Sequence, residues 1–220
     1  MIVPTAYLPP ITYFVHILRE GICVEQWESY VKQTLRNRCE IDSPQGRLRL
    51  TMPVEKPDDG SRLIRDFRLS NHGNWQHQHW QALVSSYGNS PFFEYYQDDF
   101  RPLYEQKHVF LLDFNESLMQ KCCELIDIFP RIHRTSSFGC AREGDLPVPA
   151  VQTAKLSDGI AVFEQTHAVA SVPYYQVFAS QHGFLPNLSI VDLLFNMGPE
   201  SVLILQRMAE TADAEIAQIQ

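Results

Sequence analysis

The fold of this chain is decided near its N-terminus by the stretch RCEIDSPQGRLRLTMPV, residues 38–54. Apolar and polar residues alternate on both sides of Ser43-Pro44-Gln45-Gly46, which is rich in turn-forming residues. Alternation with a period of two is typical of half-buried strands, so we predict strands at 38–41 and 47–54. The turn between them joins the two strands into a β-hairpin.

Toward the N-terminus, the pattern predicts a strand at 2–7, a helix at 10–18 and a buried strand at 22–24. Pro9-Pro10 stops the first strand, and proline is favoured in the first turn of a helix. Gly21 is expected to end that helix. The first 54 residues therefore supply most of the predicted strands.

Helices dominate toward the C-terminus. Asn74 is placed to cap a helix at 75–87, and Gly88 to end it. The other predicted elements are strands at 63–69 and 109–113, helices at 92–104, 116–129, 190–196 and from about 199 onward, an element at 174–181, and a long loop or flap at 130–160. Strands early and helices late indicate an α+β fold. We predict a single domain over 1–220, with a short mixed sheet from the N-terminal strands packed against mainly C-terminal helices.

The composition narrows the class of protein. A chain of 220 residues, 45% hydrophobic and 20% charged, is typical of a globular protein with a substantial core. Its net charge of −8 argues against a general nucleic-acid binder. Residues 32–68, however, hold nine of the 18 Lys and Arg residues. This basic segment suits a small anionic ligand, and solvated strand faces are the alternative reading.

Cysteine usage and hydropathy bear on location. The five cysteines include no CxxC pair, which favours a reduced, cytoplasmic protein. Residues 1–18 carry no Asp, Glu, Lys or Arg, but they lack a basic leader and are interrupted by prolines. The uncharged stretch 168–191 contains polar residues and two prolines. We therefore expect a cytoplasmic protein with no membrane span.

The pair Asn37-Arg38, with Lys32 upstream, is the best candidate for binding an anion. A guanidinium group grips a phosphate or carboxylate through two parallel hydrogen bonds, and a lysine adds a point charge. On a strand, Arg38 would face away from Asn37 and Cys39. An Arg38 that pairs with a carboxylate of the protein itself remains the structural alternative.

Three histidines, His72, His77 and His79, suggest a zinc site at first sight. On a helix, positions 77 and 79 lie about 200° apart, so both cannot easily bind one ion. The HExxH spacing is also absent, and we predict no metal. His79 is the better candidate for a general acid or base, because it lies at the edge of the apolar helix face. A histidine packed at the margin of the core is the alternative.

No nucleophile or cofactor motif is evident. The sequence lacks Gly-x-Ser-x-Gly, a P-loop and a glycine-rich dinucleotide turn, so we expect no cofactor. Cys23 and Cys39 lie in apolar strands and read as inert core thiols. Ser189 and Asp192 could be taken for a catalytic pair, but their spacing before an apolar run favours a helix cap in the form of a capping box.

Several motifs together resemble one family. They are YLPPITYF (7–14), Tyr30 with Lys32, Asn37-Arg38, LRLTMPV (48–54), WQHQHW (75–80), Tyr87, SPFF (90–93), YYQVF (174–178) and FLPNLSIVDLLFNMGPES (184–201). In this order they resemble the WbqC-like proteins over nearly the whole chain, most weakly in 130–170. One departure is Thr5-Ala6, where many members carry a glutamine–proline pair.

The resemblance implies a role beside genes for O-antigen and other surface polysaccharides, as an enzyme of sugar modification by acyl or amino-acid transfer. It singles out seven candidate site residues: Tyr7, Lys32, Asn37, Arg38, His79, Tyr87 and Asp192. Our hypothesis is a transferase acting on a nucleotide-linked amino sugar. Arg38 and Lys32 would hold the phosphates, Asn37 the sugar, and His79 would accept a proton.

Two alternatives remain open from the sequence. One is a non-catalytic ligand-binding or scaffold protein of a polysaccharide biosynthesis complex, and the other is a metal-dependent enzyme using the three histidines. A homo-oligomer also remains open.

Overall fold

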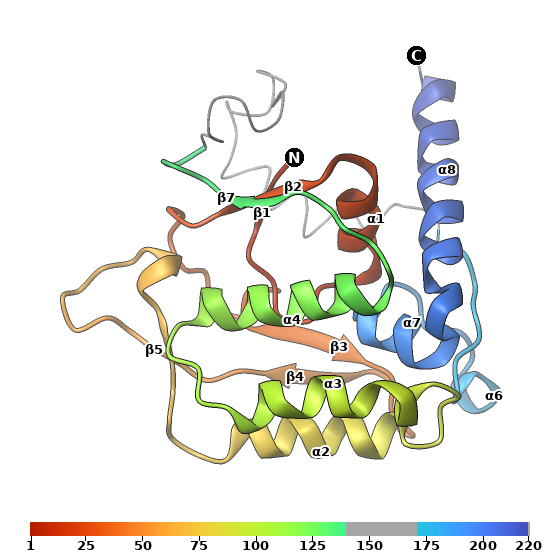
Figure 1. Ribbon diagram of the computed structural model, residues 1–220, viewed down its shortest axis with the longest axis horizontal. Helices are drawn as coiled ribbons and strands as arrows, with labels where there is room; N and C mark the ends of the chain where they lie inside the picture. The colour runs from red at the N-terminus through yellow and green to blue at the C-terminus, as the bar shows by residue number, and fades with distance from the viewer. Residues whose placement is uncertain (140–170, 220) are drawn as a thin grey trace.

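The α+β fold expected from the sequence is confirmed in the computed structural model of the protein, which describes residues 1–139 and 171–219 (Figure 1). Strands lie mainly in the N-terminal third of the chain, and helices in the middle and C-terminal parts. In place of one mixed sheet, the described residues form three small sheets. Among these residues, no helix is both long and apolar enough to cross a membrane.

The N-terminal segment forms a strand–helix–strand unit. Strand β1 (Ile2–Pro4) pairs in parallel with β2 (Ile22–Glu25), and helix α1 (Ile11–Glu20) connects them. A parallel pair requires such a crossover. Strand β7 (Ile132–Arg134) adds to the other side of β2, also in parallel. Gly21 ends α1 with φ +67°. A Cβ at this position would lie 2.9 Å from the backbone oxygen of Arg131, the residue before β7, so the position requires glycine.

The predicted hairpin is present. Strands β3 (Arg38–Ile41) and β4 (Leu48–Thr51) pair antiparallel, with Glu40 opposite Arg49. The predicted strand at 47–54 is divided, because Pro53 lacks the N–H that a continuous strand would need. The chain resumes as β5 (Val54–Glu55), which pairs with β6 (Arg68–Leu69).

Helices enclose the hairpin and the core. They are α2 (Trp75–Tyr87), α3 (Phe93–Glu105), α4 (Leu111–Leu125), α6 (Ala179–His182), α7 (Ile190–Met197) and α8 (Ser201–Ile219), with 3-10 turns η1 (Ile64–Asp66) and η3 (Gly198–Glu200). Helices α2 and α3 lie side by side, and α8 leads away from the body to the C-terminus (Figure 1). Helix α7 is buried along nearly its whole length and contacts α1, α2, α3, α4 and α8. It is the centre of the core.

One predicted strand, at 109–113, is wrong, and another, at 63–69, is confirmed only in part. Residues 109–113 contribute only one isolated bridge, at Phe110, before α4 begins at Leu111. The buried positions of α4 recur every three to four residues, so the helical period overrides the short apolar run. In 63–69, the 3-10 turn occupies the first half and only Arg68–Leu69 is a strand. Of the predicted loop at 130–160, residues 132–134 form β7, and 140–160 lie outside the described residues.

Candidate functional site

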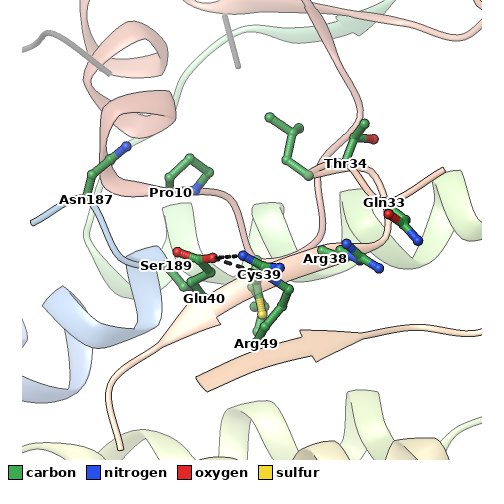
Figure 2. Close-up of a pocket in the computed structure, with 11 residues that line it drawn as sticks. Pro10, Gln33, Thr34, Arg38, Cys39, Glu40, Arg49, Asn187 and Ser189 are labelled. Atoms are coloured by element: carbon green, nitrogen blue, oxygen red, sulfur yellow. Dashed lines mark hydrogen bonds and ion pairs between the residues drawn. The ribbon is translucent and has the colours of Figure 1, made fainter. Parts of the chain in front are cut away.

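One face of the β3–β4 hairpin forms the floor of a pocket of about 370 Å³. Its walls come from the turn before α1, from the segment before β3 and from the segment before α7 (Figure 2). The lining residues are Leu8, Pro10, Gln33, Thr34, Leu35, Arg38, Cys39, Glu40, Arg49, Asn187 and Ser189. The pocket therefore combines an apolar wall with a floor that carries charge.

Arg38 is the predicted site residue that lies in this pocket. Its Nε is buried and has no hydrogen-bond partner, and the described residues offer the guanidinium no carboxylate. The arginine that does pair with a carboxylate of the protein is Arg36, two residues earlier. Arg36 is fully buried and donates two hydrogen bonds to Glu28, of 2.8 and 2.7 Å. Arg38 thus has the unused hydrogen-bonding capacity that an anionic ligand would take up.

The second guanidinium group of the pocket floor belongs to Arg49. Arg49 donates to Glu40 at 2.7 and 3.2 Å, and Arg47 reaches the other oxygen of the same carboxylate at 2.9 Å. Burial acts to raise the pKa of Glu40, but the hydrogen bonds from the two arginines outweigh it and hold that pKa below its ordinary value. Glu40 is therefore a carboxylate shared between two cations.

The segment 187–189 closes the pocket from the far end of the sequence. Its backbone is tied to the hairpin by a hydrogen bond from Ser189 N to Glu40 O, and to the N-terminal turn by one from Ile11 N to Leu188 O. The Asn187 side chain accepts a hydrogen bond from Thr12 N at 3.1 Å, while its Nδ2 is buried without a partner. The N-terminal turn and residues 187–189 therefore form one continuous wall.

Two other predicted residues of this region lie outside the pocket. Asn37 is buried directly before β3 and donates from Nδ2 to Met52 O at 2.9 Å, so it fixes the backbone just after β4. Lys32 is exposed and does not line the pocket, although the next residue, Gln33, does. Of the predicted anion-binding residues, only Arg38 faces the cavity.

Tyr7 and His79 meet inside the core. The Tyr7 hydroxyl lies 2.9 Å from His79 Nδ1 and 2.9 Å from the Tyr104 hydroxyl. Burial lowers the pKa of His79 to about 4, although a hydrogen bond to the Thr51 backbone acts in the opposite direction. Burial also raises the pKa of Tyr7 well above its ordinary value. The imidazole is therefore neutral at pH 7, and it does not line the pocket.

Tyr87 and Asp192 form a second buried pair. The Tyr87 hydroxyl donates to Asp192 at 2.8 Å and accepts from Asp42 N at 3.0 Å. Asp192 also accepts hydrogen bonds from Tyr174 and Gln176. Burial raises the pKa of Asp192 to about 6, although these donors act to lower it. The carboxylate joins α7 to α2 and to the segment that carries Tyr174.

The two pairs are separate from the pocket floor, so the structure does not bring the seven predicted residues into one cavity. The capping interpretation of Ser189 is confirmed, since its side chain accepts from Val191 N. The capping box is not, because the Asp192 carboxylate binds the tyrosines instead.

Comparison with known proteins identifies the family. The model of the WbqC-like protein family matches residues 5–156, more than half of the chain. The chain belongs to the WbqC-like family.

A curated relative of this WbqC-like protein carries no named activity. The uncharacterized protein Rv1507c of Mycobacterium tuberculosis is 28% identical over 219 residues, which span 91% of this chain and 94% of that protein. No solved structure matches significantly.

The histidines and cysteines of the WbqC-like protein do not form a metal site or a reactive nucleophile among the described residues. His72 and His77 are exposed while His79 is buried, and the described residues contain no group of three or more side chains able to hold a metal ion. Cys39, Cys122 and Cys123 are free and buried, and Cys23 is buried as well. Burial raises the pKa of the Cys39 thiol far above its usual range, which makes it a poor nucleophile even though it lines the pocket.

Sequence reasoning missed Arg49 and Asn187. Arg49 could have been found from the predicted hairpin, because the turn sets the register that places it on the same face as Arg38. Asn187 could not, since only the tertiary fold brings a residue so distant in sequence to the N-terminal turn.

Proposed function

We propose that this WbqC-like protein is a transferase of surface-polysaccharide biosynthesis that modifies a nucleotide-linked amino sugar by acyl or amino-acid transfer. The pocket on the β3–β4 hairpin would bind the substrate, with Arg38 as the ligand of its phosphates. Family membership supports the biological setting. The observation that supports this binding site concerns the Arg38 guanidinium group. It lines the pocket and has no hydrogen-bond or ion-pair partner among the described residues.

The size and lining of the pocket fit a small molecule. A volume of about 370 Å³ lies in the range typical of ligand sites, which combine apolar walls with a few polar groups. Leu8, Pro10 and Leu35 supply the apolar wall. Asn37 acts from below by holding the hairpin, and Lys32 would meet only a part of the substrate that extends outside the pocket.

Binding can be tested by calorimetry with a UDP-linked amino sugar and with the same sugar lacking phosphate. Arg38→Ala should weaken binding of the nucleotide sugar by about tenfold or more, because a charged, bidentate contact is lost. The matched control is Arg101→Ala, which removes an exposed arginine from α3 and should leave affinity unchanged. Equal affinity of wild type and Arg38→Ala would contradict this assignment.

The transfer step requires a base, for which we propose His79. Its imidazole is neutral at pH 7 and has a nitrogen that can take up a proton, but burial lowers its pKa to about 4, so it is a weak base unless substrate binding changes its surroundings. It is buried against Tyr7 and does not line the pocket, so the proposal requires that Tyr7 and its neighbours move to admit the substrate. Product formation from a labelled acyl or amino-acid donor, measured in wild type and His79→Gln, tests this role.

A second candidate is a non-catalytic binding protein. It is favoured by the lining of the pocket, whose ionisable groups are Arg38, Arg49, Glu40 and Cys39. Glu40 is held by two arginines and Cys39 has a raised pKa, so none of the four is a ready base. Saturable binding of a nucleotide sugar with no product from any donor, and with the same affinity in His79→Gln, would favour this candidate.

A further inference from the structure

Arg38, Glu40 and Arg49 share one face of the hairpin. Arg38 and Glu40 are two residues apart on β3, and Arg49 lies directly opposite Glu40 on β4. Arg38 and Arg49 are therefore diagonal neighbours, a spacing across which long side chains reach one another. Figure 2 shows both guanidinium groups above β3, within the pocket that they line.

The charged groups of this face include more guanidinium groups than carboxylates. The single carboxylate of Glu40 serves both Arg47 and Arg49, and Arg38 has no carboxylate among the described residues. In the pocket lining, the guanidinium groups of Arg38 and Arg49 thus face one carboxylate, that of Glu40, while Arg47, outside the lining, interacts with both Glu40 and Asp42. An anion with two charged groups offers one to each of the two guanidinium groups in the lining.

The contact between Arg49 and Glu40 is exchangeable. The side chains of Arg49 and Glu40 are 58% and 34% exposed, and ion pairs this accessible to solvent are weak. If Arg49 left Glu40, the carboxylate would keep its hydrogen bond to Arg47. Movement of Arg49 toward a ligand would therefore leave no carboxylate without a partner.

We propose that Arg49 is a second phosphate ligand, released by Glu40 when substrate binds, and that Arg38 and Arg49 together select a diphosphate over a monophosphate. The inference rests on the proposed function and narrows it to substrates whose sugar and nucleoside are joined by a diphosphate. Each guanidinium group would grip one phosphoryl group through parallel hydrogen bonds. A monophosphate bound at Arg38 does not require Arg49, so Arg49 would stay with Glu40 in that complex. Only a diphosphate would draw Arg49 away from Glu40, and this difference would set the selectivity.

The test compares UMP, UDP and inorganic pyrophosphate by calorimetry at low ionic strength. Arg49→Ala should weaken UDP and pyrophosphate about tenfold and change UMP by less than about twofold, because it removes only the second charged contact. Glu40→Gln should tighten UDP by about threefold or more, since Arg49 no longer has a competing carboxylate. Arg38→Ala should weaken all three ligands.

Controls separate this inference from misfolding. Arg49→Lys keeps the charge without the fork and should retain part of the preference for UDP. Arg101→Ala, remote on α3, should bind as wild type does, and circular dichroism checks that each variant is folded.

Three outcomes would overturn the inference. If Arg49→Ala weakened UMP and UDP equally, or neither, Arg49 would not read the second phosphate, while an effect of Arg38→Ala would still support the proposed site. Dependence on Arg49 with UDP but not with pyrophosphate would place it at the nucleoside. If the wild type bound none of the three, the phosphate-binding role of the pocket would fail as well.

Discussion

His79 and Asp192 are buried titratable residues whose pKa values move in opposite directions. Burial lowers the pKa of the imidazole to about 4 and raises that of the carboxyl group to about 6. In both cases burial disfavours the charged form. The two residues therefore give the free energy of unfolding opposite dependences on pH, and substitution of one residue at a time separates them.

The first prediction concerns His79. In the unfolded chain it takes up a proton near pH 6.5, whereas in the fold it does so only near pH 4. The unfolded state thus binds more protons between these values, and the free energy of unfolding falls as the pH drops through that window. The contribution of His79, present above pH 6.5, amounts to about 3 kcal/mol.

In His79→Gln this part of the pH dependence should disappear, which urea unfolding at pH 7 and pH 4.5 would measure. Asp192 contributes the opposite slope between about pH 4 and 6, but it is present in both proteins and cancels in the comparison. His77→Gln, at an exposed position of the same helix, is the control. An unchanged difference between the two pH values in His79→Gln would contradict the prediction.

At the scale of elements, the Asp192 carboxylate connects three parts of the chain. It lies on α7, accepts from Tyr87 on α2, and accepts from Tyr174 and Gln176 in the segment before α6. Gln176 also donates to Leu185 O and accepts from Leu185 N. These bonds fix the path of the chain that leads to residues 187–189, which form part of the pocket wall.

The second prediction follows from this connection. Tyr174→Phe removes one donor to a buried carboxylate and should lower the free energy of unfolding by about 1–3 kcal/mol. Tyr175→Phe is the matched control, because Tyr175 is exposed and should change stability by less than about 0.5 kcal/mol. Thermal and urea unfolding of the two variants measure the difference, and equal stability of the pair would count against the role of Tyr174.

The sequence predicts elements best where local signals agree. The strand at 38–41 and the helix at 75–87 have the predicted bounds, because turn residues and periodicity coincide there. The predicted cap is wrong, since the Asn74 side chain makes no capping hydrogen bond. Residues 109–113 were assigned wrongly since a short apolar run fits a strand as well as a helix start.

In the candidate site, too, some features follow from the local sequence and others depend on tertiary packing. Arg38 is singled out by its residue type, and the structure places it in the lining of the pocket, while its role as an anion ligand stays a prediction. That Arg36 rather than Arg38 is paired with Glu28, and that Asn37 lies buried, depends on tertiary packing. Proximity in sequence also placed Lys32 in the site, although the backbone turns its side chain to the surface.

On the scale of the whole molecule, the packing of the helices around α7 contributes to the free energy of unfolding. Helix α8 packs on α1 through one side, with Leu205 fully buried and Leu203 on the opposite side 48% exposed. Leu205→Ala should reduce the free energy of unfolding by about 2–5 kcal/mol, through lost burial and the cavity left behind. Leu203→Ala should change it by less than about 0.5 kcal/mol. Urea unfolding of both variants tests whether α8 belongs to the cooperative core, and equal losses would show that it does not pack as described.

The pocket takes its floor from residues 38–49 and one wall from Asn187 and Ser189. During synthesis the chain emerges from the ribosome N-terminus first, so the hairpin segment is made long before that part of the wall. A complete binding site forms only after residue 189 has been made and α7 has docked. A ligand that needs the whole pocket therefore cannot guide the early steps of folding on the ribosome, and it stabilises only a chain whose C-terminal part is already in place.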